Sequence, residues 1–209
     1  MGRERVAMII LKSSEEIAVM RRAGRIVAEC HARLREWVKP GVTTGELNDK
    51  VDELIRRRGG LPSFKGYRGY PASICTSVNE EVVHGIPGPR RLVEGDIVGI
   101  DIGACVDGFH GDAAYTYPVG RVDPEVQRLL QVTEEALYRG IEAAKVGGRL
   151  SDISHAIQRH VEQAGFSVVR DLVGHGIGRQ MHEDPQVPNY GPPGRGVLLR
   201  PGMTLAIEP

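Results

Sequence analysis

The sequence predicts an α+β protein of 209 residues that consists of two similar halves. Each half contains two amphipathic segments with helical spacing, followed by β-branched segments that glycine and proline interrupt. The halves also align with each other, because Lys39–Gly41 matches Lys145–Gly147 at a shift of 106 residues and Gly95–Asp101 matches Gly202–Glu208 at a shift of 107. This duplication implies halves related by an approximate twofold axis, each with helices covering an antiparallel sheet.

The elements of the first half follow from local patterns. Residues Ser14–Glu36 carry apolar side chains at a spacing of three and four, which predicts one amphipathic helix. Thr43 and Glu46 form a capping-box pattern that begins a second helix, and Gly59 ends that helix. We expect the strands between about Ala72 and Val119.

The second half repeats this order. Asp123 and Pro124 are the expected start of a third helix. Its predicted apolar face comprises Val126, Leu129, Leu130, Ala136, Leu137 and Ile141. Ser151 and Asp152 are expected to cap a fourth helix, which runs to Gly165. We expect one catalytic domain over residues 1–209, with halves at about 13–120 and 121–209.

Composition narrows the classes of function. Lys plus Arg and Asp plus Glu are both 27, and no basic run is present, so we expect no nucleic-acid partner. No apolar run reaches the length of a membrane span or of a signal-peptide core, so no membrane partner is expected. Three scattered cysteines argue against a disulfide framework. A cytoplasmic monomer is the expected form.

Two aspartates raise the question of a metal site. Asp101 and Asp112 lie eleven residues apart in a segment that otherwise reads as buried strand. The turn pattern at 106–108 lets the chain return as a second strand and bring Asp112 near Asp101, with the pairing register left open. Because two close carboxylates repel unless a cation lies between them, we expect a divalent metal ion there.

The second half supplies further donors. His175 and His182 lie in a glycine-rich segment in which a helix is improbable, so we expect both on a loop or strand that faces a site. Glu208 is expected to end a strand, as Asp101 does in the first half. Two aspartates, a histidine and a glutamate suit Mn, Fe, Co or Zn in a two-metal hydrolytic site better than a structural zinc site. Any one of these residues alone would more often be a turn, cap or surface group.

The other histidines receive structural interpretations. We interpret His110 as structural, and we expect His31, His155 and His160 to lie solvated on helices.

Taken together, several motifs resemble those of the methionine aminopeptidases of bacterial type I, whose duplicated pita-bread fold is shared with prolidase and aminopeptidase P. The resemblance runs from about Ser13 to the last residue. The motifs are Gly66–Pro71, Ser77–Glu80, His84–Pro87, Gly95–Val98 with Ile100–Asp101, Asp107–Asp112, Gly174–Gly178 with His182–Glu183, and Ile207–Pro209.

The resemblance implies removal of N-terminal methionine from nascent proteins and peptides with a small second residue. It implies two divalent ions bridged by water or hydroxide, with Asp101, Asp112, His175 and Glu208 as four of five ligands and Asp112 bridging. Metal coordination makes hydroxide available near neutral pH for attack on the scissile carbonyl.

It also assigns roles beside the metals. Glu208 is the implied proton acceptor, His182 the donor to the developing oxyanion, and His84 a contact to the scissile amide. The methionine pocket would contain Tyr67, Tyr70 and Cys75, with Phe64 and Met181 at positions where family members vary.

One departure from the family pattern concerns the fifth ligand, a second Glu about thirty residues beyond Glu208. The sequence given ends at Pro209, so we expect a C-terminally truncated form that lacks the last strand hairpin, with weak or absent turnover. Two alternatives stay open: a proline-directed aminopeptidase of the same fold, and a metal-free binding protein or inactive fragment.

Overall fold

The computed structural model describes residues 8–209, so the first seven residues of the expected domain lie outside the described residues. Two units make up the chain. The N-terminal unit is Ala18–Arg128, and the C-terminal unit groups Met1–Ile17 with Leu129–Pro209. The expected single catalytic domain stays a prediction.

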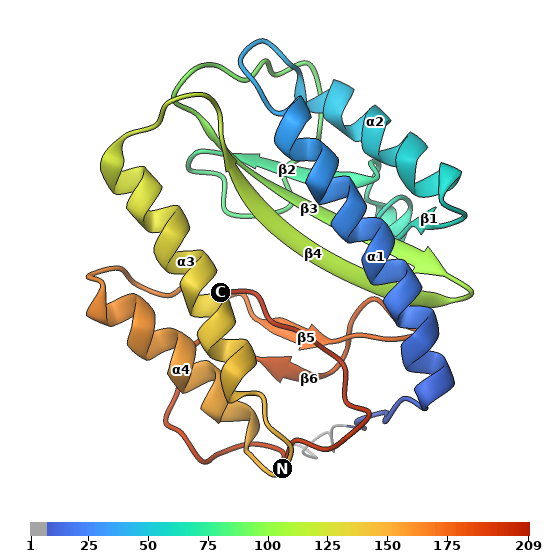
Figure 1. Ribbon diagram of the computed structural model, residues 1–209, viewed down its shortest axis with the longest axis vertical. Coiled ribbons are helices and arrows are strands. Elements are labelled where there is room, and N and C mark those ends of the chain that lie inside the picture. Colours follow the sequence, from blue (N-terminus) through green and yellow to red (C-terminus); the bar gives the residue numbers. More distant parts are fainter. Residues whose placement is uncertain (1–7) are drawn as a thin grey trace. The chain divides into compact units, whose positions relative to one another are not determined.

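The first two helices begin at the predicted residues. α1 (Ser14–Trp37) starts after Ser13, whose hydroxyl accepts the Glu16 N–H at 3.2 Å while the Glu16 carboxylate accepts the Ser13 N–H at 3.0 Å. α2 (Thr44–Arg57) carries the predicted capping box of Thr43 and Glu46. Both helices pack along one face of the first sheet (Figure 1).

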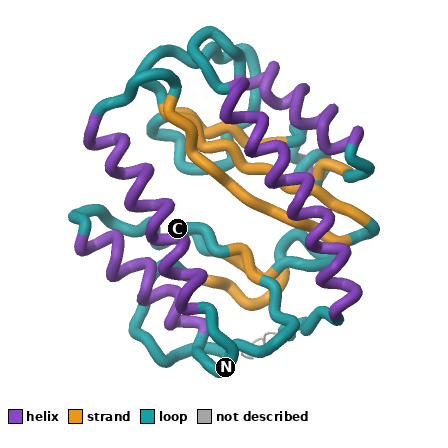
Figure 2. Tube along the Cα trace, viewed as in Figure 1, coloured by secondary structure: helices purple, strands orange, loops and turns teal. Residues whose placement is uncertain are grey.

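The sheet of the N-terminal unit has four antiparallel strands. They are β1 (Leu61–Pro62), β2 (Ile74–Val78), β3 (Ile97–Val106) and β4 (Phe109–Pro118). β3 is the central strand, because β1 and β2 both pair with it and β4 pairs along its other edge. Figure 2 shows the long β3–β4 ribbon in orange. β1 and the short 3₁₀-helix Tyr67–Gly69 precede the predicted strand region, so its start was placed too late.

The two faces of β3 differ in chemistry. One face is buried against α1 and α2 and consists of Val98, Ile100, Ile102, Ala104 and Val106. On that side β4 approaches α1 at Gly111, where an added Cβ would lie 2.7 Å from the Gly24 backbone nitrogen. Because strand side chains alternate, Asp101 belongs to the opposite face.

The helices of the C-terminal unit confirm two predicted elements and correct their details. α3 (Pro124–Ala143) starts at the expected proline, but its buried residues are Val132, Ala136 and Gly140, whereas the predicted Leu129 and Ile141 are exposed. Periodicity alone could not choose between these neighbouring stripes of α3, since both carry apolar side chains.

α4 (Leu150–Gln163) begins two residues earlier than a cap at Ser151 would place it. Arg149 is its N-cap, and Asp152 is the third helical residue, whose carboxylate accepts the Arg149 N–H at 2.7 Å. Ser151 instead accepts the Arg195 N–H at 2.7 Å. The expectation that Ser151 and Asp152 cap this helix is therefore wrong in position, although Asp152 does satisfy a donor at the helix start.

The second sheet has three short strands in the order β6-β5-β7. β5 is Gly174–Gly176, β6 is Glu183–Val187 and β7 is Leu205–Ala206. Ile153, Ile157 and Val161 of α4 form the core of this unit together with Val187 and Leu199.

Backbone hydrogen bonds confirm the internal duplication. Gly41 donates its N–H to Leu92 O at 2.7 Å, and its counterpart Gly147 donates to Leu199 O at 3.0 Å. The two glycines have φ values of 92° and 87°, a left-handed conformation that glycine tolerates without strain. The repeat therefore preserves turn geometry as well as helix order.

The expectation that each half ends a strand on a carboxylate is wrong. Asp101 lies in the middle of β3, which continues to Val106, and Glu208 lies beyond β7, which ends at Ala206. Within residues 8–209, no helix is both long enough and apolar enough to cross a bilayer.

Candidate metal centre

The β3–β4 hairpin places both aspartates on one face of the sheet. Asp107 and Gly108 form its turn with φ values of 47° and 77°. Asp101 then pairs with Ala114, and Asp112 pairs with Gly103. Directly opposed residues share a face, so Asp101 and Asp112 are diagonal neighbours on the face away from the helices. Their predicted proximity is confirmed, and the register that the sequence left open is fixed.

Gly103 makes room for an aromatic side chain beside the two aspartates. A Cβ at this position would lie 2.7 Å from Phe64 Cε1 and 2.7 Å from Ser63 Cβ. Phe64 is buried, with 8% of its surface exposed. The absence of a side chain at Gly103 therefore lets Phe64, a predicted pocket residue, pack on the same face as the carboxylates.

Cys75 and Tyr70 line the same face. Cys75 pairs with Asp101 across β2 and β3. Burial raises the pKa of the Cys75 thiol to about 11, the Tyr70 hydroxyl opposes the shift, and the Asp101 and Asp112 carboxylates add to it. Burial also raises the pKa of Tyr70, whose hydroxyl donates to Gly85 O at 2.9 Å. Both groups are therefore neutral near pH 7.

Tyr67 and His84 lie in a short 3₁₀-helix and in a loop, respectively. Tyr67 donates its N–H to Phe64 O at 2.9 Å. His84 is exposed and has φ 60°, a left-handed conformation that is uncommon for histidine. The next residue, Gly85, carries the carbonyl that accepts the Tyr70 hydroxyl. The backbone directly after His84 is thus hydrogen-bonded to the predicted pocket residue Tyr70.

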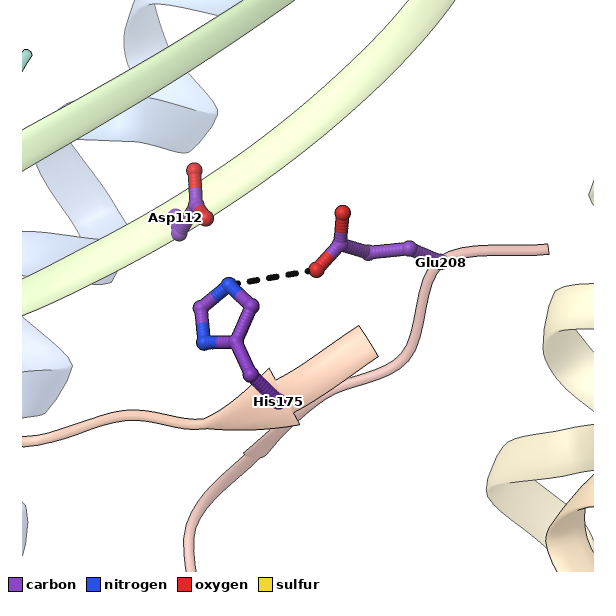
Figure 3. Close-up of side chains that lie close together, drawn as sticks. All are labelled: Asp112, His175 and Glu208. Carbon is purple, nitrogen blue, oxygen red and sulfur yellow. Dashed lines mark ion pairs between the residues drawn. The ribbon is translucent and has the colours of Figure 1, made fainter. Parts of the chain in front are cut away.

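In the C-terminal unit, β5 presents His175 to Glu208. The Nε2 atom of His175 lies 3.2 Å from Glu208 Oε1 (Figure 3). Its Nδ1 atom lies 2.8 Å from Gly176 O, and a carbonyl can only accept, so Nδ1 carries the proton in the neutral ring. Nε2 then keeps its lone pair and is the atom available to a metal ion.

His182 and Met181 precede β6. The His182 and His175 rings are tilted against each other with centroids 4.3 Å apart. Met181 is buried, with 3% of its surface exposed, whereas His182 is exposed. The predicted position of both histidines on strand or loop is confirmed.

Asn189 supports Glu208 and has no signal in the sequence. It is buried, with 4% of its surface exposed, and its Nδ2 donates to Glu208 O at 2.6 Å. Nineteen residues separate the two in the chain, so no local pattern could reveal the contact.

Among the remaining histidines, the expectation for His31 is wrong. Its Nε2–H donates to Ala113 O at 2.8 Å and its Nδ1 lies 2.8 Å from the Tyr117 hydroxyl. Burial lowers the pKa of His31, because the charged ring would lose its hydration. His110, interpreted as structural, lies 2.8 Å from Ser63 Oγ. His155 and His160 are half-buried, and His160 pairs with Glu135 at 3.1 Å, so neither is fully solvated.

Each unit supplies donors of a type that suits divalent cations. Asp112, His175 and Glu208 each offer a ligand atom, and Asp101 shares a sheet face with Asp112. Carboxylate oxygens with an imidazole nitrogen suit borderline divalent ions, and a cation would relieve the repulsion between carboxylates. A metal-dependent hydrolytic site is the chemistry that these residues support.

Residues 18–209 match the profile of metallopeptidase family M24, and the chain belongs to this family. Within it, the chain is similar to methionine aminopeptidases. It is 58% identical to methionine aminopeptidase 1 of Bacillus subtilis over 97% of this chain and 82% of that protein. It is 56% identical to the methionine aminopeptidase of Clostridium perfringens over 97% of this chain and 81% of that protein. The resemblance inferred from the motifs is confirmed.

Solved structures confirm the fold prediction. The methionine aminopeptidase of Thermotoga maritima matches with a TM-score of 0.94 and 50% identity, covering 96% of this chain and 81% of that one. The prolidase of Pyrococcus furiosus matches with a TM-score of 0.82 and 25% identity, covering 95% of this chain and 56% of that one. The chain therefore has the duplicated α+β fold of the family.

Proposed function

We propose that this protein removes the N-terminal methionine from proteins and peptides whose second residue is small. The observation that carries the proposal is the 58% identity to a methionine aminopeptidase over 97% of the chain. The carboxylate hairpin and the His175–Glu208 pair supply donors suited to metal-dependent hydrolysis.

The proposed metal centre holds two divalent ions of Co, Mn, Fe or Zn. Asp101, Asp112, His175 and Glu208 are the residues that would hold these ions. Family membership and the neutral tautomer of His175 support this set. When bound, such ions act as Lewis acids and lower the pKa of water toward neutrality.

The surrounding side chains have distinct proposed roles. Glu208, whose side chain is 45% exposed, accepts a proton from the attacking water. His182 donates to the oxygen on which negative charge develops, and the exposed His84 contacts the scissile amide. The ring contact with His175 supports this role for His182, because it limits the orientations that the imidazole can adopt.

The proposed methionine pocket is neutral and largely apolar. Phe64, Cys75 and Met181 are buried, and the Cys75 thiol keeps its proton because its pKa is about 11. Tyr67 and Tyr70 complete the proposed lining. An unbranched thioether is suited to such a surface, which offers aromatic contacts and no charge.

The proposed substrates in the cell are the N-termini of nascent polypeptides, near the ribosome. We propose that the protein acts on them in the cytoplasm as a monomer. Its balanced charge supports a peptide partner rather than a nucleic acid.

A peptide assay with added Mn or Co tests the proposal. We expect release of Met from Met-Ala-Ser and none from a Xaa-Pro dipeptide. Elemental analysis should find divalent metal in the protein, and Asp101→Asn should reduce the metal content.

Preferred cleavage before proline would instead favour the prolidase-like alternative. A protein with neither metal nor cleavage would favour the binding-protein alternative.

A further inference from the structure

A buried ion pair lies next to His182 and outside the proposed ligand set. Lys12 Nζ contacts Glu183 Oε2, and the two side chains are only 3% and 5% exposed. The other described ion pairs each have at least one side chain exposed by 44% or more. Burying two charges is costly unless geometry and further hydrogen bonds compensate, so this pair needs a structural or functional reason.

Further contacts satisfy both charges and join three segments of the C-terminal unit. Lys12 Nζ also donates to Ile10 O at 3.1 Å, and the Lys12 N–H donates to Gly202 O at 2.8 Å. Glu183 Oε1 accepts the Gln180 N–H at 3.1 Å. The pair therefore links residues 10–12 to the turn that runs from β5 to β6.

Gly178 makes space for this ion pair within the turn. A Cβ there would lie 2.4 Å from Lys12 Cε and 2.6 Å from Glu183 Oε1. No larger residue fits without displacing one of the charged groups. The turn is thus built around the pair rather than merely adjacent to it.

The backbone connects the pair to His182. Met181 and the Glu183 side chain are buried, whereas His182, which lies between them in the bend before β6, is exposed. Glu183 also pairs with Gly176, the neighbour of His175, at a register shift in the β5–β6 ladder. Fixing Glu183 inward therefore fixes the direction of His182.

We propose that Lys12 and Glu183 are positioning residues for His182, acting through the turn that their buried ion pair holds. This inference rests on the proposed role of His182 as a donor to the developing oxyanion. Losing the pair would leave the metal ligands in place and let the imidazole move relative to the substrate. Displacement of a catalytic group by about 1 Å can cost on the order of 10²-fold in rate.

Kinetics of the metal-loaded chain provide the first test. We expect Glu183→Gln to lower kcat by roughly 10- to 100-fold with little change in KM. In a His182→Ala background, the same substitution should change kcat by less than about 2-fold, because residues that act through one another are not additive. An equal loss in both backgrounds would overturn the proposal.

A second variant separates positioning from the penalty of an unpaired buried charge. Glu183→Gln leaves Lys12 charged without its partner, which can destabilise the fold. The double variant Lys12→Met with Glu183→Gln removes both charges, so its melting temperature should recover. Its kcat should stay low, because Met at position 12 cannot donate a hydrogen bond to the side chain at position 183. Recovery of kcat along with the melting temperature would show a purely structural pair.

The imidazole resonances of the metal-free protein supply a readout independent of turnover. In protein labelled with ¹⁵N-histidine, Glu183→Gln should shift the ring signals of His182 and of His175, whose rings are in contact. Glu29→Gln, which breaks the exposed Arg58–Glu29 pair in the N-terminal unit, is the matched control and should leave them unchanged. Unchanged His182 signals in Glu183→Gln would overturn the positioning role even if the chain released no methionine.

Discussion

The two units support their proposed ligands in different ways. Asp101 lies within a ten-residue strand and pairs with Cys75 on one side and Ala114 on the other. Glu208 lies beyond a two-residue strand; Asn189 donates to its backbone carbonyl, and its carboxylate lies 3.2 Å from His175 Nε2. The repeated helices and glycine turns are alike, whereas the supports of the carboxylates are not.

This difference shows what the duplication preserves. The turns at Gly41 and Gly147 make the same hydrogen bond in both units, so the repeat conserves backbone scaffolding. Strand ladders fix the backbone that carries Asp101, whereas a side-chain hydrogen bond from Asn189 fixes the backbone of Glu208. Single substitutions should therefore affect the second carboxylate through residues that have no equivalent in the first unit.

The largest expected effect comes from a ligand on the strand ladder. Asp112→Asn should reduce kcat/KM for Met-Ala-Ser by about 10³-fold, since it removes a charge worth several kcal/mol to metal catalysis. Asp107→Asn, in the turn of the same hairpin, is the control and should retain activity, because Asn also tolerates a positive φ. Comparable losses in both variants would contradict the assignment.

A smaller effect is expected from the support of Glu208. Asn189→Ala removes the 2.6 Å hydrogen bond to Glu208 O. Loss of hydrogen bonds to ligating groups typically costs about 10- to 100-fold in metal affinity, and because this bond reaches the Glu208 backbone we expect a loss near the lower end, which titration calorimetry measures. Asn48→Ala is the control, because it removes a hydrogen bond to Ser73 N–H in the other unit. Equal metal affinity in the Asn189 variant and the unmodified chain would contradict a supporting role of Asn189 for Glu208.

Two glycines of β3 allow a matched test of packing. Gly103→Ala should lower the free energy of unfolding by about 1–3 kcal/mol, since its Cβ would lie 2.7 Å from Phe64 and from Ser63. Gly99→Ala lies on the same face, where the nearest atom, Thr116 Oγ1, is 3.5 Å away, and it should be tolerated. Urea unfolding of both variants measures the difference, and similar losses would count against the tight approach of Phe64.

The smallest effect compares the two matching helix starts. Thr43→Ala removes the hydroxyl that accepts the Glu46 N–H at 3.1 Å and should cost about 1 kcal/mol of stability. Arg149→Ala should cost less, because Asp152 accepts a hydrogen bond from the Arg149 backbone, which alanine retains. Thermal unfolding of both variants measures the two stability losses. A larger loss from Arg149→Ala than from Thr43→Ala would contradict the prediction.

Sequence reasoning succeeded where the signal was local. The capping box at Thr43 and the hairpin turn at Asp107 depend on residues within a few positions, and both are present. The apolar face predicted for α3 is right at Ala136 but wrong at Leu129 and Ile141, because burial depends on which elements pack against that helix. β1 was missed because a two-residue strand has no periodicity of its own.

The ligand residues were predicted better than their supports. Asp101 and Asp112 stand out because carboxylates are unusual within buried strands. The Lys12–Glu183 pair spans 171 residues and the Asn189–Glu208 contact spans nineteen, so neither leaves a pattern in neighbouring positions. His31 was misread because a polar helix neighbourhood does not show that its ring reaches Ala113 and Tyr117.

The tight turn at Asp107–Gly108 has a consequence for folding kinetics. It closes a hairpin in which eleven residues separate Asp101 from Asp112, whereas thirty-three separate His175 from Glu208. Short loops lose less entropy on closure, and hairpins form in about 1–10 μs. We therefore expect β3–β4 amides to gain protection from hydrogen exchange before those of β5–β7. The hairpin that carries Asp101 and Asp112 should form before the sheet that carries His175.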